Sequence, residues 1–459
     1  MVQSMTDKYC IIGGGASGIA AAKNFVERSI PFDLLEREKD LGGLWNINTP
    51  SGIVYESTHL VSCISSTGFD DFPMLDEDYV EYPSHDIVLD YFRKYVDKFK
   101  IGPHLQFNSA VESVTPEADG SFLVKVKGEA SPRHYRGVVV ANGHHEQPRM
   151  PSYPGTFTGE VMHSKFYKGQ RQLRDKRVLV IGAGNSACDI VKDAAYASGE
   201  KVIMSMRHGT WFIPKFLLGI PTGDIASNVE WALTWVPRTV KAYLFQAVLW
   251  LLQGPPSRYR LPDPTYRIDQ AHPSMSDDIP RLAAHGRIHV KPDVARFEGK
   301  EAVFTDGTRE EIDLVIYATG YQLAIPFLDR SLFLGADGRP NLYLNAFHPK
   351  YENLYFCGML QANGAMWRLA DYQGKIIAND IVAMATAPEE HAAFRAEAKT
   401  HFGEKQVVTY IESDRHMLER NYYDFARLLK QIARKFRKAG RLNLPTTRSI
   451  PAARAAAAE

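Results

Sequence analysis

Two short apolar runs in the chain share one pattern of hydrophobic and polar positions. Tyr9–Ile12 and Val178–Ile181 are each followed by a glycine-rich turn and then by small residues that suit a helix. Short apolar runs bounded by turn residues are typical of buried strands in a parallel sheet. The pattern therefore predicts two strand–turn–helix units and an α/β fold with two Rossmann-like dinucleotide-binding domains.

The segment between these two units has a different pattern. Asp86–Phe99 carries apolar residues at helical spacing, and Ser84 just before it is a typical N-cap residue. Alternating segments up to Val140, among them Phe122–Val126, predict a β-meander. One amphipathic helix and a group of antiparallel strands are therefore expected here.

The pattern after the second unit predicts strands followed by helices. Ile288–Val315 alternates as strands do and contains Asp306-Gly307, which is typical of a hairpin turn. Asn353–Cys357 predicts a last strand, and helical sequence follows to about Lys438. The alanine-rich segment 441–459 is of low complexity, and we expect it to be disordered.

A long apolar segment, Val229–Leu252, raises the question of a membrane span. It contains Glu230, Pro237 and Lys241, so it falls short of an uninterrupted run of ~20 apolar residues. We therefore expect a packed amphipathic helical insertion and no transmembrane span. A wall of the substrate tunnel, or a surface that rests on a membrane, is the alternative interpretation.

Composition narrows the class of protein. A chain of 459 residues suits two or three domains. A net charge of +1 gives no reason to expect a nucleic-acid partner. No secretory signal is recognisable, so we expect a cytoplasmic protein. The four cysteines form no CxxC pair and no metal-ligand spacing, so we expect reduced, buried thiols and no metal site; they are Cys10, Cys63, Cys188 and Cys357.

The turn after the first strand has the sequence of a dinucleotide-binding loop. Its first glycine makes the tight turn, its second lets the backbone approach a pyrophosphate, and its third allows close packing of helix on strand. Glu36 ends the next strand, where a carboxylate accepts hydrogen bonds from ribose hydroxyls and repels a 2′-phosphate. This pattern predicts a site for FAD or NAD made by Gly13, Gly15, Ala16, Ser17, Gly18 and Glu36.

The second unit differs from the first at the end of the strand after the loop, where the ribose is bound. No acidic residue ends the strand Val202–Met206; Arg207 stands there, and a guanidinium can hold a 2′-phosphate through two hydrogen bonds. NADPH is therefore expected, bound by Gly182, Gly184, Asn185, Ser186, Ala187 and Arg207. With FAD at the first loop, the two sites together predict a pyridine-nucleotide-dependent flavoprotein.

The order of these elements predicts an FAD domain with an inserted NADPH domain. Pro148, Pro151 and Pro154 mark the crossover between them. We expect the following parts: 1–150, first part of the FAD domain; 151–325, NADPH domain with a helical insertion at about 219–264; and 326–440, second part of the FAD domain with C-terminal helices.

A segment between the loops, Phe157–Tyr167, fits the pattern FxGxxxHxxxY at every fixed position. Together with both loops, Gly42-Gly43-Leu44-Trp45, Asp71-Phe72-Pro73 and Ala318-Thr319-Gly320-Tyr321, it makes the chain resemble the flavin-containing monooxygenases. These are class B flavin-dependent monooxygenases, a group that also includes the Baeyer–Villiger enzymes. The Baeyer–Villiger branch usually ends this segment with Trp and then Pro or Asp, whereas Tyr167-Lys168 stands here. The resemblance therefore favours the branch that oxidises heteroatoms.

The resemblance implies a reaction and further contacts. NADPH reduces FAD, O2 adds to give a flavin C4a-hydroperoxide, and an amine nitrogen or a sulfide sulfur attacks the distal oxygen. This chemistry needs a dry, preorganised pocket more than a catalytic acid. The resemblance also implies that Leu44 and Trp45 touch FAD, and that a helix near Ala370–Gln373 turns its N-terminus toward the flavin. His163 is expected to order the crossover, and His144-His145 to be structural.

One position departs from the family pattern. The family commonly places an asparagine near flavin and NADP, about eight residues before the position of Phe69, and Val61-Ser62-Cys63 stands there instead. Ser62 is the candidate to replace the asparagine as a hydrogen-bond donor and is the catalytic candidate of the chain. An enzyme that releases H2O2 is an alternative outcome of this departure.

Other readings of the sequence remain open. Baeyer–Villiger oxygenation of ketones is one, and a flavoprotein reductase or NADPH oxidase is another, although a disulfide reductase would be expected to carry a CxxC pair. A nucleotide sensor without enzymatic activity is a third. The expected partners are a small-molecule substrate and O2, and a homodimer is an open alternative.

Overall fold

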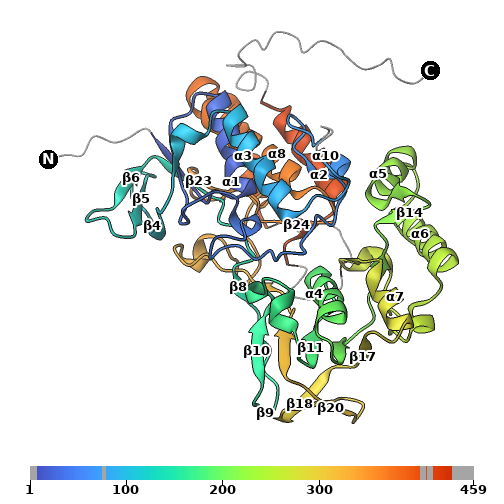
Figure 1. Cartoon of the computed structure of the whole chain (residues 1–459). Helices are drawn as coiled ribbons and strands as arrows, with labels where there is room; N and C mark the ends of the chain where they lie inside the picture. Colours follow the sequence, from blue (N-terminus) through green and yellow to red (C-terminus); the bar gives the residue numbers. More distant parts are fainter. Residues whose placement is uncertain (1–7, 75–78, 404–409, 411–416, 437–459) are drawn as a thin grey trace.

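The computed structural model describes residues 8–74, 79–403, 410 and 417–436. The segment 441–459, expected to be disordered, lies outside these residues. Two five-stranded sheets organise the described chain. The part around the first sheet lies at the top of Figure 1, the part around the second sheet lies below it, and α5 and α6 lie to the right.

The first sheet is parallel throughout and has the order β23-β7-β1-β2-β3. Its strands are β1 (Tyr9–Ile12), β2 (Phe32–Leu35), β3 (Leu105–Gln106), β7 (Gly137–Val140) and β23 (Leu354–Phe356). Because β23 follows the whole second sheet in sequence, the first nucleotide-binding unit is built from two separate pieces of chain.

Both faces of this sheet are covered. Successive side chains of a strand point to opposite faces, and so Tyr9 and Ile11 share a core with the helices, whereas Cys10 and Ile12 share a core with a β-meander. The helices of the first face are α1 (Ala16–Glu27), α3 (His85–Lys98) and α8 (Met366–Thr386). The meander is β4 (Val111–Pro116), β5 (Phe122–Val126) and β6 (Arg133–Tyr135). The expected helix and meander are thus confirmed.

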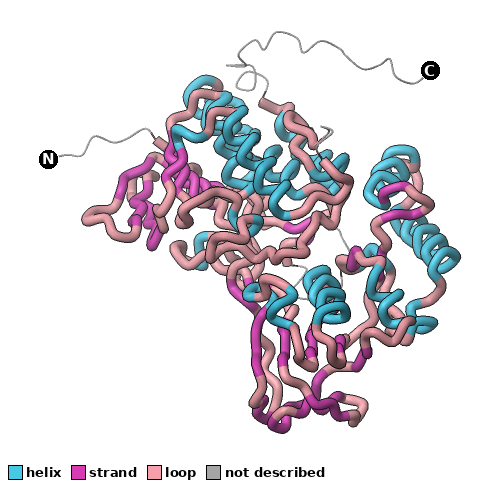
Figure 2. The backbone as a smooth tube through the Cα atoms, viewed as in Figure 1, coloured by secondary structure: helices cyan, strands magenta, loops and turns pink. Residues whose placement is uncertain are grey.

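The second sheet has the parallel order β10-β21-β11-β12-β17, and its strands run side by side at the lower end of Figure 2. They are β10 (Glu160–His163), β11 (Val178–Ile181), β12 (Val202–Ser205), β17 (His289–Lys291) and β21 (Leu314–Tyr317). One face packs against α4 (Asn185–Ala197) and α7 (Asp278–Ala284).

The other face of the second sheet packs on a smaller four-stranded sheet. That sheet comprises β9 (Gly155–Phe157), β18 (Val294–Gly299), β19 (Glu301–Phe304) and β20 (Arg309–Glu311). Strands β19 and β20 are antiparallel, and Gly307 between them has φ +81°. The hairpin predicted at Asp306-Gly307 is confirmed, because a positive φ there favours glycine.

The apolar segment Val229–Leu252 falls in α5 (Thr222–Ala232), α6 (Arg238–Gln253) and the connection 233–237 between them. The expected packing is only partial: Trp235 is 79% exposed and Leu251 85% exposed, and Ala242 and Leu249 are the buried residues of α6. Within the described part of the chain, no helix is both long and apolar enough to cross a bilayer.

Several expected boundaries shift by one residue. Helix α3 begins at His85, and the Ser84 hydroxyl donates to the Asp86 carboxylate instead of accepting a hydrogen bond from a backbone amide.

The four cysteines are free and buried, as expected. The remaining elements are α2 (Ile64–Thr67), α9 (Pro388–Thr400), α10 (Tyr422–Ala433), β8 (Gln147–Pro148), β13 (Phe212–Ile213), β14 (Phe216–Leu217), β15 (Ile220–Pro221), β16 (Ser274–Met275), β22 (Tyr321–Gln322), β24 (Gln361–Ala362) and β25 (Glu419–Arg420).

Candidate functional site

The first glycine loop is shaped by backbone contacts that leave no room for side chains. Gly13 has φ +111°, and a Cβ there would lie 2.6 Å from the carbonyl oxygen of Ala141. A Cβ at Gly18 would lie 1.8 Å from the carbonyl oxygen of Gly13, because α1 packs directly on the loop. Gly15 differs, since a Cβ there would meet only Gly43 Cα at 3.7 Å. The protein alone does not require glycine at position 15, which fits a position kept small for a ligand.

The N-terminus of α1 opens beside this loop. The first hydrogen bond within the helix runs from the amide of Ile19 to the carbonyl of Gly15, so the amides of Ala16, Ser17 and Gly18 precede it. Such amides, at the positive end of the helix dipole, suit a pyrophosphate. Gly358 follows β23 with φ +79°, and a Cβ there would lie 2.0 Å from Ser17 Oγ. The two pieces of the first unit therefore meet at the loop.

Glu36 lies where a carboxylate would accept hydrogen bonds from the ribose of a bound dinucleotide. Its Oε2 accepts a 2.5 Å hydrogen bond from the amide of Gly14, and its Oε1 accepts one of 2.9 Å from the amide of Glu38. Burial raises the pKa of Glu36, and these two amides oppose the increase. The carboxylate is thereby fixed beside the glycine loop with lone pairs left to accept ribose hydroxyls. These features fit an FAD site.

The Gly42–Trp45 motif packs on the same loop. Gly43–Trp45 forms a short 3₁₀ turn, and the amide of Gly42 donates to the carbonyl of Gly14. The Trp45 and Trp367 rings meet edge to face with centroids 6.1 Å apart. Leu44 and Trp45 are therefore held beside the first glycine loop.

The second glycine loop repeats the geometry of the first. Gly182 has φ +133°, and a Cβ there would lie 2.4 Å from the carbonyl oxygen of Ala318. Gly184 is the N-cap of α4, whose first turn contains Asn185, Ser186 and the fully buried Ala187. This loop lies at the carboxyl end of its parallel sheet, which is the usual place for a dinucleotide.

A returning segment fixes the second loop from the other side. The Ser274 hydroxyl donates to the carbonyl of Ala183 at 2.6 Å, and the amide of Met275 donates to Oδ1 of Asn185 at 2.9 Å. Asn185 therefore uses its side chain to order the loop. These two partners were not found from the sequence, because they lie about 90 residues away from the loop.

Arg207 follows β12 and is exposed. Among the described residues, none forms a hydrogen bond or an ion pair with its guanidinium. A free guanidinium at the end of this strand is available to an anionic group, as the sequence predicts for a 2′-phosphate.

His163 of the FxGxxxHxxxY segment is 1% exposed. Its Nδ1 accepts a hydrogen bond from the amide of Lys165 at 3.1 Å, so Nε2 carries the proton and lies 3.0 Å from the carbonyl oxygen of Gly320. Burial lowers the pKa of this imidazole. His163 thus joins the crossover to the Ala318–Tyr321 motif, which agrees with the ordering role expected from the sequence.

Tyr167 at the end of the same segment makes a buried contact with α4. Its hydroxyl donates to Oδ2 of Asp193 at 2.8 Å, and the Ser57 hydroxyl donates to the same oxygen. One turn earlier on α4, Oδ2 of Asp189 accepts a 2.7 Å hydrogen bond from Tyr55. Neither aspartate was expected as a functional residue from the sequence, although their spacing of four residues places them on one face of the helix.

A buried lysine explains the Asp71-Phe72-Pro73 motif. Nζ of Lys23 on α1 lies 2.6 Å from Oδ2 of Asp71 and 2.7 Å from Oδ1 of Asp371 on α8. Burial lowers the pKa of Lys23, but the carboxylates of Asp371, Asp71 and Glu27 outweigh this effect and leave the pKa raised. Helix α8 begins at Met366, so the expected N-terminus near Ala370 lies one turn earlier than predicted.

Ser62 does not offer a free hydrogen in this arrangement. The Thr67 hydroxyl donates to the carbonyl of Cys63 at 2.8 Å, and Ser62 Oγ lies 2.7 Å from Thr67 Oγ1. Because each hydroxyl has one hydrogen, Ser62 donates to Thr67 and keeps only acceptor capacity. A donor role toward a cofactor requires the side chain to rotate.

The segment after Ser62 contacts the inserted helices. The thiol of Cys63 lies 3.8 Å from Oδ1 of Asp224 on α5, and the Ser65 hydroxyl donates to the same carboxylate. Ligand atoms of Cys63, Glu81 and Asp224 all lie within 4.8 Å of one another. The insertion therefore rests against the segment that replaces the family's asparagine.

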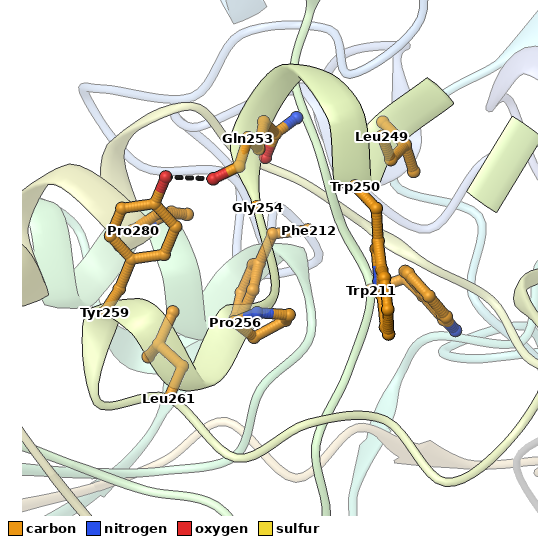
Figure 3. Close-up of a pocket in the computed structure, with 10 residues that line it drawn as sticks. All are labelled: Trp211, Phe212, Leu249, Trp250, Gln253, Gly254, Pro256, Tyr259, Leu261 and Pro280. Atoms are coloured by element: carbon orange, nitrogen blue, oxygen red, sulfur yellow. Dashed lines mark hydrogen bonds between the residues drawn. The ribbon is translucent and has the colours of Figure 1, made fainter. Parts of the chain in front are cut away.

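A separate pocket lies between the insertion and flanking residues, among them Trp211, Phe212 and Pro280 (Figure 3). Trp211 and Trp250 stand on one side of it, and Tyr259 donates a hydrogen bond to the carbonyl of Gln253 on the other. None of its lining residues belongs to either glycine loop. We therefore do not assign it to the candidate site.

Two parallel sheets, each with a glycine loop and a helix N-terminus at its carboxyl end, define a protein that binds two dinucleotides. A family model described as FMO-like, flavin-binding monooxygenase-like, matches residues 6–438. Dimethylaniline monooxygenase (N-oxide-forming) 2 of Rattus norvegicus is 30% identical over 448 residues, covering 92% of this chain and 81% of that protein.

Solved structures agree with this fold. S-allyl-L-cysteine S-oxygenase from Allium sativum superposes with a TM-score of 0.65 at 20% identity, covering 94% of this chain and 89% of that one. OTEMO in complex with FAD and NADP superposes with a TM-score of 0.68 at 17% identity, covering 94% and 98%. The chain belongs to the flavin-binding monooxygenase-like family. It is an NADPH-dependent flavin monooxygenase whose cofactors are FAD and NADP(H).

Proposed function

We propose that the protein transfers one oxygen atom of O2 to a soft nucleophile, either an amine nitrogen or a sulfide sulfur. The observation that carries this proposal is the 30% identity, over 92% of the chain, to a relative named for forming N-oxides. The end of the FxGxxxHxxxY segment supports it, because Tyr167-Lys168 replaces the residues usual in the Baeyer–Villiger branch. Tyr167 is fully buried at the contact with α4.

We further propose which residues hold the cofactors. FAD is bound by Gly13, Gly15, Ala16, Ser17, Gly18, Glu36, Leu44 and Trp45, and NADPH by Gly182, Gly184, Asn185, Ser186, Ala187 and Arg207. The corresponding domains are 1–150 with 326–440 for FAD and 151–325 for NADPH, with the insertion at about 219–264. Bound FAD and NADPH supply the electrons and activate O2.

The residues of the chain position the two cofactors and keep water away from the site. Helix N-termini at the two loops hold the pyrophosphates, and Glu36 and Arg207 give each site its nucleotide preference. The contacts of Asp224 with Cys63 and Ser65 bring the insertion over the 61–67 segment and limit entry of water. Ser62 acts there as a hydrogen-bond acceptor unless its side chain rotates.

Product analysis tests the proposal. The flavin-loaded enzyme is supplied with NADPH, ¹⁸O2 and one of three probes: methyl phenyl sulfide, N,N-dimethylaniline or cyclohexanone. We expect a sulfoxide or an N-oxide that carries one ¹⁸O atom, with one NADPH consumed for each product formed. A lactone from cyclohexanone without sulfoxide or N-oxide would overturn the assignment. NADPH consumption that yields only H2O2 would identify an oxidase.

A further inference from the structure

Glu419 has a buried carboxylate that receives no hydrogen bond from the described part of the chain. Its side chain is 0% exposed, and no described residue donates a hydrogen bond to either carboxylate oxygen. The ring nitrogen Nδ1 of His272 lies 3.5 Å from Oε1, and this nitrogen also has no hydrogen-bond partner among the described residues. Buried polar groups in native proteins almost always have a partner, and each exception calls for a ligand, a water or a strain-based reason.

The position of Glu419 connects it to the first glycine loop. Strand β25, which contains Glu419, pairs in parallel with β24, so that Glu419 is opposite Gln361. Strand β24 begins three residues after Gly358, the residue that sits against Ser17. Figure 1 shows β24 at the lower edge of the upper part of the molecule, facing the second nucleotide-binding unit.

His272 connects the same carboxylate to the second glycine loop. It precedes Ser274 and Met275, whose hydrogen bonds hold Ala183 and Asn185. The pair of Glu419 and His272 thus joins segments that touch the two loops. At such a junction the reactive ends of two bound dinucleotides and a substrate would meet.

Two further groups, His145 and Tyr410, interact electrostatically with Glu419. The ring of His145 packs on Tyr321, with centroids 5.3 Å apart, and Tyr321 packs on His163 at 5.2 Å. Desolvation is the main cause that lowers the pKa of His145 to about 4; the neighbouring His272 adds to the decrease, and Glu419 opposes it. His145 is therefore neutral at pH 7 and does not neutralise the carboxylate.

We propose that Glu419, with His272 beside it, is an acceptor subsite for a nitrogen that carries N–H hydrogens. The proposal rests on the oxygenation proposed above. Two ligands have this chemistry: an amino group of the substrate, remote from the atom that is oxygenated, and the carboxamide of the nicotinamide. A carboxylate accepts from either through a charge-assisted hydrogen bond, which is stronger than a neutral one.

Glu419→Gln tests the subsite, because it keeps the size of the side chain and removes its charge. Glu397→Gln is the matched control: Glu397 bonds Tyr343 and Lys435 in the C-terminal helical region and has no contact with His272. All measurements use the flavin-loaded enzyme. If Glu419→Gln does not retain flavin, Glu419→Asp takes its place in the same comparisons. This variant keeps the charge and shortens the side chain.

The cofactor arm compares two ligands by titration, with the change in flavin absorbance or heat as the readout. They are NADP⁺ and 2′,5′-ADP, which lacks the nicotinamide. If the carboxamide is the ligand, Glu419→Gln lowers the affinity for NADP⁺ about tenfold and leaves the affinity for 2′,5′-ADP unchanged. This arm does not depend on turnover, so it reports on Glu419 even if the proposed oxygenation fails.

The substrate arm compares 2-(methylthio)ethylamine with ethyl methyl sulfide. If an amino group is the ligand, the variant raises KM for the first by about tenfold and leaves KM for the second unchanged. Absence of sulfoxide from either probe with the wild type would count against the proposed function instead. If the variant alters neither comparison and only lowers Tm, Glu419 and His272 form a structural ion pair and the proposal is wrong.

Discussion

The hydroxyl of Tyr55 donates a 2.7 Å hydrogen bond to Oδ2 of Asp189, and this bond joins the two nucleotide-binding units. Tyr55 lies between β2 and α2 of the first unit, whereas Asp189 lies on α4, whose N-terminus faces the second glycine loop. Ser57 makes an equivalent contact with Asp193 one turn further along α4. The position of α4 relative to the first unit therefore depends on hydroxyl groups that bond two aspartates.

Loss of the Tyr55 hydroxyl should impair electron transfer more than it impairs folding. A hydrogen bond to a charged group contributes about 1.5 to 3 kcal/mol, so Tyr55→Phe should slow anaerobic flavin reduction by NADPH about tenfold. Stopped-flow absorbance of the flavin measures this rate. Tyr153→Phe is the control, because its hydroxyl bonds Asp293 within the second unit. Equal rates for the two variants would show that the Tyr55 contact does not position α4.

Stability should depend on pH through Asp189. Burial raises the pKa of Asp189 to about 6, so the folded protein holds this proton more tightly than the unfolded chain does. Its contribution to stability is therefore largest below about pH 4, falls as the pH rises toward about 6, and is constant above that. The full loss is at most about 3 kcal/mol.

Asp189→Asn checks this dependence because the amide still accepts from Tyr55 and does not titrate. We expect its Tm, relative to that of the wild type, to rise between pH 4 and pH 7 and to stay level from pH 7 to pH 8. A Tm difference that is flat across pH 4–7 would contradict the raised pKa.

The two glycines Gly13 and Gly15 should fail in different ways when replaced by alanine. At Gly13 a methyl group meets Ala141 at 2.6 Å and φ is +111°, so Gly13→Ala should destabilise the protein itself by about 1 to 3 kcal/mol. At Gly15 the nearest atom is at an ordinary 3.7 Å, so Gly15→Ala should keep the Tm of the flavin-free protein and lose FAD affinity. Tm and the flavin content after purification separate the two cases, and a fully yellow Gly15→Ala protein would remove Gly15 from the site.

Arg207 should set the preference for NADPH over NADH. Arg207→Ala should raise KM for NADPH by about tenfold or more and change KM for NADH by less than about twofold, because only NADPH carries the 2′-phosphate. Arg287→Ala, at another exposed arginine of the same unit, is the matched control. Equal increases of KM for both nucleotides would show that Arg207 does not bind the phosphate.

Local patterns in the sequence were enough to predict the two nucleotide-binding units. Tyr9–Ile12 and Val178–Ile181 are strands in the structure, and the hairpin at Asp306-Gly307 forms as expected. These elements depend on neighbouring residues, through hydrophobic periodicity and the backbone freedom of glycine. The extent of burial along α6 was not predictable in this way, because it depends on what packs against each face.

The sequence by itself determined the fold class, the two glycine loops and the contrast between Glu36 and Arg207. Only the tertiary structure decided that Ser62 donates to Thr67, that Tyr55 reaches Asp189, and that Glu419 lies beside His272. Tyr55 and Asp189 lie 134 residues apart in the chain, and Glu419 and His272 are farther apart still. Contacts of this kind follow from how sheets and helices pack together, and no spacing along the chain specifies them.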